Sequence, residues 1–469
     1  MKRKPTLFEA VLPIIIMLLF LSIGFGILKL RPEPLLILSS VFAALITLKL
    51  GYSWQEMMDG IQEKISLAMP SILILISIGI LIGTWMIAGT IPMLIYYGVQ
   101  MINPKYILVI SFVVAAIIAV VTGTSWGAVG TVGVALIGIA TGLEANISAT
   151  AGAIVAGAFF GDKLSPLSDT TILAPIAAGS ELYDHIKHML WTTIPATILS
   201  LIVYFIVGLN VESKTIESPL AQNMIIELEQ MFNWNILLLI PPIIILYGTI
   251  RKYPTLPVII ISSITAGIIA MIFQKSTIQD VFLSTVSGFN VDMVTKIQIT
   301  ENDIMPEVLR LVNQGGMEAM TSVVLIAFAA FVFAGIITTS GSLEVIIEAL
   351  LKVVKRTGDL ILATVLSCMT MALVTGNSYL SIIVPGEMYK DTYKMKKLAP
   401  KNLSRTLEDS GTVIVPLIPW SSAGVFMAAT LGVPTLSYAP WAILCYTGFI
   451  FAIILGYTGI GITQLDEEK

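Results

Sequence analysis

The stretch Gly161–Pro175 reads GDKLSPLSDTTILAP and interrupts a chain that is otherwise almost continuously apolar. It carries the ionisable residues Asp162, Lys163 and Asp169 and four hydroxyl side chains, and its two prolines remove amide donors that a helix needs. A charged side chain at the bilayer centre costs about 2.5–3.5 kcal/mol, and irregular backbone is tolerated there only inside protein or beside water. The stretch therefore predicts a broken helix that holds an ion site. The alternative is an extramembrane loop between two spans.

The composition points to the membrane. The chain has 469 residues, of which 56% are hydrophobic and only 12% charged, and its mean hydropathy is +0.91. Soluble domains carry about 25% charged residues. We therefore expect an all-α polytopic membrane protein in contact with the lipid bilayer. The basic start MKRKPT precedes the apolar run Val11–Leu28 without an evident cleavage site, which predicts a retained first span.

Several classes of function are disfavoured by what the sequence lacks. The formal net charge of −4 gives no reason to expect a nucleic-acid partner. A GxxxxGK[ST] phosphate loop is absent, which argues against transport driven by ATP in this chain. Cys368 and Cys445 lie in apolar runs and are expected to pack there, and two histidines make a structural zinc site improbable. We expect no cofactor.

Apolar runs and polar interruptions divide the chain into two halves. Residues 1–209 are expected to form a first transmembrane repeat, 210–234 a polar linker, and 235–469 a second repeat with an extramembrane excursion at 290–316. The expected spans are Val11–Leu28, Leu35–Leu50, Ser66–Ala88, Tyr106–Val121 and Ile194–Gly208, then Ile236–Ile250, Leu256–Phe273, Ser322–Ile337, Leu360–Val374 and Tyr438–Tyr457.

Four matches in the same order predict an internal repeat. The sequence LLILSSVFAALI after Pro34 resembles VIIISSITAGII after Pro257, and MPSILI at Met69 resembles MTSVVL at Met320. TGTSW at Thr122 resembles TGNSY at Thr375. The fourth match aligns the segments Leu167–Pro175 and Leu407–Pro416 with one inserted residue. Recurring polar breaks of this kind are typical of a transporter site between repeats, and an odd number of crossings in each half would make the repeats inverted.

The fourth match pairs Asp169 with Asp409 as sodium ligands across the repeat axis, with Asp162 and Glu408 nearby. Oxygen atoms suit a hard cation, and a buried carboxylate has a raised pKa because desolvation disfavours its charged form. Such a group can hold a proton and release it when sodium arrives, which is the minimal chemistry of antiport. The alternative is a structural role, in which Asp162 forms an ion pair with Lys163 or another basic residue and only stabilises the packing. The predicted ion- and proton-carrying residues are Asp162, Asp169, Glu408 and Asp409, and the predicted coordinating residues are Thr124, Ser125, Ser165, Ser168, Thr170, Asn377, Ser378 and Ser410.

Two other features allow two interpretations each. The breaks TGTSW and TGNSY could bind a cation, or a substrate carboxylate through amides at helix N-termini, or they could serve close helix packing through small residues. His185 and His188 share one helix face and could sense pH. The favoured interpretation places them at the membrane interface beside Trp191.

With these residues in view, the chain resembles the NhaC-type sodium/proton antiporter family. The resemblance rests on four motifs and is most specific in the first half: GTWMIAGTIPMLIYYG at Gly83–Gly98, TGTSWGAVGTVG at Thr122–Gly133, FFGDKLSPLSDTT at Phe159–Thr171 and HIKHMLWTTIPA at His185–Ala196. The family motif maps onto Asp162, Ser165, Ser168, Asp169 and Thr170.

The resemblance implies an antiporter of the bacterial inner membrane that exchanges Na⁺ for H⁺. It also implies the ion transporter superfamily fold: inverted repeats with broken helices or re-entrant hairpins, and a scaffold plus an elevator-like transport domain, often in a homodimer. One branch of the family exchanges malate and lactate, and this stays open as the alternative substrate class. A passive channel is a second class. An intramembrane enzyme is a third, disfavoured because no nucleophile and base stand out by spacing.

Overall fold

The protein is described by a computed structural model that covers residues 2–209, 219–251, 253–297 and 303–465. Within these ranges the chain is helical, and the backbone pairing outside helices is one isolated bridge between Leu398 and Gln464. Nine of the described helices are long and apolar enough to cross a membrane, or up to twelve if each of three bent pairs is one span. The predicted all-α polytopic class with broken helices is confirmed.

The first half contains ten α-helices. Its long helix α3 starts at a capping box in which Ser53 and Glu56 satisfy each other's backbone amides, and it begins at Trp54, well before the expected span Ser66–Ala88. The elements are α1 (Leu7–Phe20), η1 (Leu21–Ile27), α2 (Pro32–Lys49), α3 (Trp54–Ile87), α4 (Thr90–Met101), η2 (Pro104–Tyr106), α5 (Ile107–Thr122), α6 (Ser125–Ala128), η3 (Val129–Gly133), α7 (Val134–Gly142), α8 (Ile147–Leu164), α9 (Asp169–Ala178) and α10 (Leu182–Leu209).

The second half follows helix α11 (Pro219–Met231), which lies in the predicted linker; residues 210–218 of that linker and 298–302 of the predicted excursion lie outside the described residues. The elements are η4 (Ile236–Leu239), α12 (Ile240–Ile250), α13 (Thr255–Ile269), η5 (Ala270–Gln274), α14 (Ile278–Val286), η6 (Val291–Met293), α15 (Pro306–Val312), η8 (Glu318–Met320), α16 (Thr321–Thr339), α17 (Ser342–Lys352), α18 (Thr357–Thr375), α19 (Ser378–Met395), α20 (Pro400–Leu407), η9 (Glu408–Thr412), η10 (Val415–Leu417), α21 (Ser422–Leu431), α22 (Thr435–Tyr438), η11 (Ala439–Trp441) and α23 (Ile443–Thr458).

Helix boundaries repeat at a constant distance along the chain. The span Pro104–Thr122 and the span Thr357–Thr375 both have 19 residues, and each second-half boundary lies 253 residues after its counterpart. The same distance of 253 residues separates the 10-residue helices α9 and α21. Left-handed glycines that end helices fall at equivalent places, namely Gly123 with Gly376 and Gly179 with Gly432. The two halves are therefore structural repeats.

This spacing corrects the fourth sequence match. In the observed register Asp169 corresponds to Ser422, since these residues begin α9 and α21. The counterparts of Glu408 and Asp409 are then Val155 and Ala156, inside α8. The alignment of the Asp169 segment with the Asp409 segment was wrong because small and apolar residues matched over too short a length to fix the register.

The repeats run in opposite directions. Helices α3 and α16 are counterparts, because each is followed by one residue and then by a left-handed glycine, Gly89 or Gly341. The beginning of α3 packs on the end of α16, where Gly60 meets Thr339, and the later part of α3 packs near the start of α16, where Gly79 meets Met320. Counterpart helices that lie antiparallel place the halves in inverted orientation.

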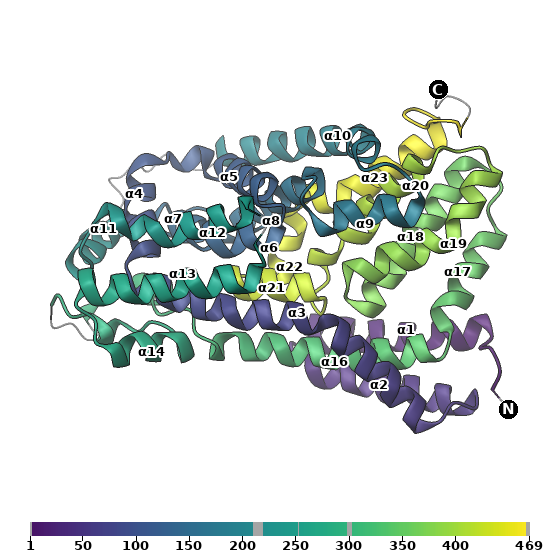
Figure 1. Cartoon of the computed structure of the whole chain (residues 1–469), viewed down its shortest axis with the longest axis horizontal. Helices are drawn as coiled ribbons and strands as arrows, with labels where there is room; N and C mark the ends of the chain where they lie inside the picture. Colours follow the sequence, from purple (N-terminus) through teal and green to yellow (C-terminus); the bar gives the residue numbers. More distant parts are fainter. Residues whose placement is uncertain (1, 210–218, 252, 298–302, 466–469) are drawn as a thin grey trace.

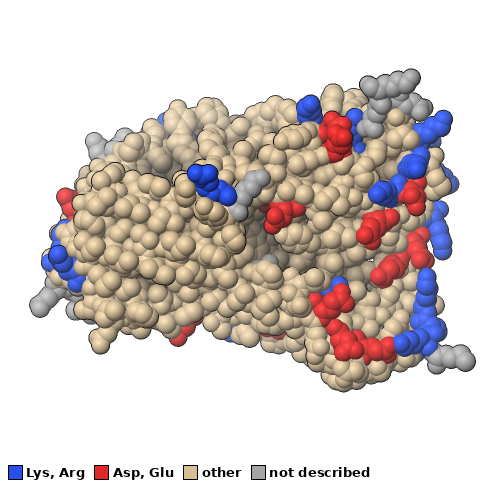
Figure 2. Space-filling view, viewed as in Figure 1, with Lys and Arg blue, Asp and Glu red and all other residues tan. Residues whose placement is uncertain are grey.

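Figure 1 shows the helices as two layers that share one long direction. The lower layer contains α1, α2, α3, α14 and α16, the upper part contains most of α5–α10 and α18–α23, and α13 and α21 lie directly above α3 where the two meet. Helix α4 at the left end and its counterpart α17 at the right end connect the layers. Charged residues gather mainly at the right-hand end (Figure 2), where both termini and the basic segment Lys390–Arg405 lie.

Candidate functional site

Four helix breaks meet at one cavity of about 430 Å³. They are the α5–α6, α8–α9 and α18–α19 junctions and the bend before α21, so each repeat contributes two. The cavity is lined by Ile74, Ile78, Thr122, Gly123, Thr124, Ser125, Trp126, Gly127, Phe159, Asp162, Leu167, Ser168, Asp169, Thr170, Ile172, Thr249, Tyr253, Thr255, Ile259, Asn377, Ser378, Tyr379, Thr412, Ser422 and Ala423. Its position between the inverted repeats is where transporters bind their substrates.

The two TG motifs shape equivalent walls of the cavity. Gly123 ends α5 with φ +68°, and Gly376 ends α18 with φ +60°, a conformation that side chains other than glycine seldom adopt. A Cβ on Gly123 would lie 2.6 Å from Leu167 Cβ, so glycine also permits the close approach of the α8–α9 junction. Thr124 and Asn377 then cap the next helices, with Asn377 accepting bonds from two backbone amides. The motifs thus serve both helix breaking and close packing.

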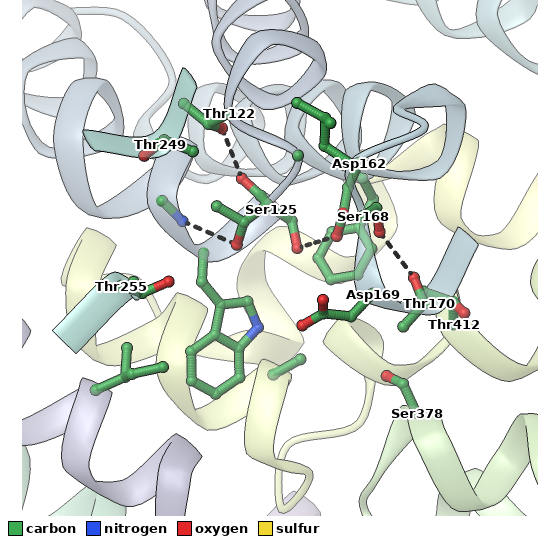
Figure 3. A pocket seen from close by; sticks show the side chains of 18 of the residues that line it. Thr122, Ser125, Asp162, Ser168, Asp169, Thr170, Thr249, Thr255, Ser378 and Thr412 are labelled. Atoms are coloured by element: carbon green, nitrogen blue, oxygen red, sulfur yellow. Dashed lines mark hydrogen bonds between the residues drawn. The ribbon is translucent and has the colours of Figure 1, made fainter. Parts of the chain in front are cut away.

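Two carboxylates face the cavity from the first repeat. Asp162 is nearly buried, and its Oδ2 accepts a 2.7 Å hydrogen bond from Ser125 Oγ. Asp169 begins α9, is exposed to the cavity, and accepts a 3.2 Å bond from Tyr379 Oη of the second repeat. Figure 3 shows Asp162 beside Ser125 and Ser168, with Asp169 near the middle of the view. Among the described lining residues there is no lysine or arginine.

A second group of charges lies behind the cavity wall. Glu408 Oε1 accepts a 3.1 Å hydrogen bond from Thr170 Oγ1, which connects it to the cavity. Asp409 forms a buried ion pair with Lys163 and accepts a 3.1 Å bond from Thr192 Oγ1. Both carboxylates sit in the short π-helical segment η9, and π-bulges recur at functional sites. Glu408 Oε2, Asp409 Oδ2 and Thr412 Oγ1 are buried without a hydrogen-bond partner.

The structure brings most of the predicted site residues together. Eight of them line the cavity: Thr124, Ser125, Asp162, Ser168, Asp169, Thr170, Asn377 and Ser378. Glu408 and Asp409 lie behind it, whereas Ser165 Oγ and Ser410 Oγ donate to the backbone carbonyls of Val120 and Thr406. Asp169 and Asp409 have different partners, Tyr379 and Lys163, and Asp409 does not line the cavity. The roles assigned to these residues stay predictions.

Sequence reasoning missed several polar residues of the site. Thr249, Tyr253 and Thr255 reach the cavity from the α12–α13 turn, and Thr412 and Ser422 reach it from the second repeat. A strict repeat register would have found Ser422, which lies 253 residues after Asp169 and likewise begins a 10-residue helix. Nothing in the sequence marks the turn between α12 and α13 as part of the site.

The two histidines are buried against a neighbouring helix. His185 and His188 are buried on α10, where their side chains bond Ser404 Oγ at 2.9 Å and Asn402 Oδ1 at 3.2 Å. Trp191 is about half exposed. The histidines join α10 to α20, and their position at the membrane interface stays a prediction.

Comparison with known proteins supplies the family. The model of the Na⁺/H⁺ antiporter family matches residues 13–179 and 157–460. The chain belongs to the Na⁺/H⁺ antiporter family. This antiporter is therefore a multi-pass membrane protein, and the resemblance read from its motifs is confirmed.

Three relatives align with the antiporter over nearly its full length. It is 52% identical over 99% of this chain and 98% of the relative to an uncharacterized Na(+)/H(+) antiporter of Haemophilus influenzae. It is 34% identical, over 98% of each chain, to the Na(+)/H(+) antiporter NhaC of Alkalihalophilus pseudofirmus. It is also 34% identical to the Malate-2H(+)/Na(+)-lactate antiporter of Bacillus subtilis, over 97% of this chain and 96% of the relative.

Proposed function

We propose that this antiporter exchanges Na⁺ for H⁺ across the cell membrane and that the cavity is its cation site. The observation that carries the proposal is the cavity lining: two carboxylates with several hydroxyl and amide oxygens, and no lysine or arginine among the described lining residues. Hard cations prefer such oxygen ligands. The four helix breaks add free backbone groups at the same place.

The exchange follows from competition at the carboxylates. Asp162 is nearly buried, and Glu408 is connected to the cavity through Thr170, so either group is stabilised by a bound cation or by protonation. A sodium ion that enters from one side of the membrane displaces the bound proton. A proton that enters from the other side displaces the sodium ion. Asp169 stands at the exposed part of the cavity, where its charge attracts the incoming cation.

Alternating access by an elevator-like movement fits this arrangement. The cavity-bearing helices α5–α10 and α18–α23 are joined to the other layer by α4 and α17, one at each end of the molecule. Movement of the upper part relative to α3 and α16 would carry the cavity from one side to the other. A homodimer, which the family resemblance implies, stays an expectation to be tested by the mass of the purified antiporter in detergent.

Reconstituted vesicles containing a pH-sensitive dye test this proposal. A sodium gradient, with choline as the control, should drive proton movement through the intact antiporter. Asp162→Asn should abolish that movement while the protein still elutes as a folded species. Full exchange by Asp162→Asn would remove the residue from the mechanism, and absence of exchange by the unmodified protein would refute the function.

Sodium-coupled exchange of malate and lactate is the second candidate. The cavity volume of about 430 Å³ exceeds what one sodium ion needs, and the Bacillus subtilis relative carries that activity in its name. An organic acid would need a cation or several amide donors, but Lys163 is buried against Asp409 and does not line the cavity. Labelled malate uptake into lactate-loaded vesicles, with and without sodium, distinguishes the two candidates.

A further inference from the structure

The cavity-bearing helices bury an unequal number of positive and negative side chains. Five charged residues of these helices are 7% exposed or less, namely Asp162, Lys163, Arg405, Glu408 and Asp409. Three are carboxylates and two are bases, so the group carries one surplus negative charge when all five are ionised. Asp169 is exposed to the cavity and is left out of this count, because water screens its charge.

The hydrogen bonds within the group do not cancel the surplus. Lys163 neutralises Asp409 in the ion pair. Arg405 donates from Nη1 to the backbone carbonyl of Gly461, and its Nε and Nη2 have no hydrogen-bond partner among the residues that the structure describes. Asp162 and Glu408 accept hydrogen bonds from Ser125 and Thr170 respectively, and both donors are uncharged. Asp162 and Glu408 thus lack a charged partner, and the charge of Arg405 offsets one of these two carboxylates, so one negative charge remains.

The buried histidines do not supply the missing charge. Their hydrogen-bond partners are Ser404 and Asn402, both uncharged. His185 Nε2 is buried without a partner, and an imidazolium there would leave both an N–H group and a charge unpaired. We therefore count both histidines as neutral.

A buried net charge is unfavourable in a membrane, so the group favours the state in which one monovalent cation is bound. A bound proton or a bound sodium ion makes the total zero, whereas two cations would bury a positive charge instead. We propose that these five residues hold one exchangeable positive charge, so that the antiporter exchanges one Na⁺ for one H⁺ and transport is electroneutral. The inference rests on the proposed function and adds its stoichiometry.

A null-point measurement on the reconstituted full chain tests the stoichiometry. The pH difference across the vesicle membrane is fixed, and the sodium gradient that stops proton movement is measured. The measurement is repeated at several membrane potentials, which are set with potassium and valinomycin. For one-to-one exchange the null sodium ratio equals the proton ratio and does not change with potential. Each net charge moved per cycle would shift the null ratio by about fiftyfold per 100 mV, and such a shift would overturn the proposal.

A charge-balanced variant provides a second test. The double change Lys163→Met with Asp409→Asn removes one positive and one negative charge of the group, so the surplus remains; exchange should become slower, but the null ratio should stay independent of potential. A potential-dependent null ratio in this variant would contradict the charge count. If the variant does not fold, the wild-type measurement decides alone. Absence of any sodium-driven proton movement in the unmodified antiporter would refute the proposed function, which is a different outcome from a shifted null ratio.

Discussion

Lys163 and Asp409 are separated by 246 residues in the chain and form a buried ion pair between the two repeats. Lys163 lies near the end of α8 and Asp409 in η9, and their side chains are 2% and 0% exposed. Such a pair adds little net stability compared with well-packed apolar residues, but removal of one partner leaves a charge buried alone. Either residue can therefore be buried without a large cost only when the two halves pack against each other correctly.

We expect Lys163→Met to lower the stability of the antiporter by about 3–5 kcal/mol, because it leaves Asp409 buried without its cation. Asp409→Asn should be similarly harmful, and the double change should be milder than either single change. The melting temperature of the detergent-solubilised protein measures the effect. A loss in the double variant equal to the sum of the two single losses would show that the two residues do not interact.

Ser125→Ala should weaken the apparent affinity for sodium, because Ser125 lines the cavity and donates to Asp162 at 2.7 Å. Loss of one such bond to a charged group corresponds to about 1.5–3 kcal/mol, or roughly a 10- to 150-fold change in affinity. Ser410→Ala is the matched control, since Ser410 Oγ donates to the Thr406 carbonyl away from the cavity. Initial rates at increasing sodium concentration compare the two, and a larger effect from Ser410→Ala would contradict the placement of the site.

Gly376→Ala should destabilise the antiporter by about 1–2 kcal/mol, the cost of a side chain in the left-handed conformation. Gly123→Ala should cost more, because its Cβ would also lie 2.6 Å from Leu167 Cβ, whereas the nearest atom to a Cβ on Gly376 is 3.1 Å away. Thermal melting of the two variants gives the order. A greater loss for Gly376→Ala would mean that the two breaks are not packed as described.

His185→Gln and His188→Gln should leave the pH dependence of transport unchanged and lower thermal stability. Both imidazoles are buried and bond uncharged groups, Ser404 and Asn402, so they act as connections between α10 and α20. Proton movement driven by sodium, recorded over a series of pH values, measures the first effect. A displaced pH profile in either variant would revive the pH-sensing interpretation.

The sequence predicted the fold class and most of the cavity because glycine and charge are informative inside a membrane. Gly123 and Gly376 mark their helix breaks by residue type alone, and Asp162 and Asp169 are conspicuous in an apolar chain. Nothing local in the basic run Lys390–Arg405 shows that Arg405 is buried and that its guanidinium donates to the Gly461 carbonyl near the end of the chain. The repeat register also needed the helix boundaries, because short apolar matches are satisfied by several alignments.

The charged group is present in only one copy, although the helices that hold it occur twice. Val155, Ala156, Val415 and Pro416 stand at the positions related by the repeat to Glu408, Asp409, Asp162 and Lys163. A transporter with chemically equivalent halves would have outward-open and inward-open forms of equal free energy. In this antiporter the two halves differ chemically, so the two forms should differ in free energy. At equal ion concentrations on both sides of the membrane, most molecules should therefore be open to the same side.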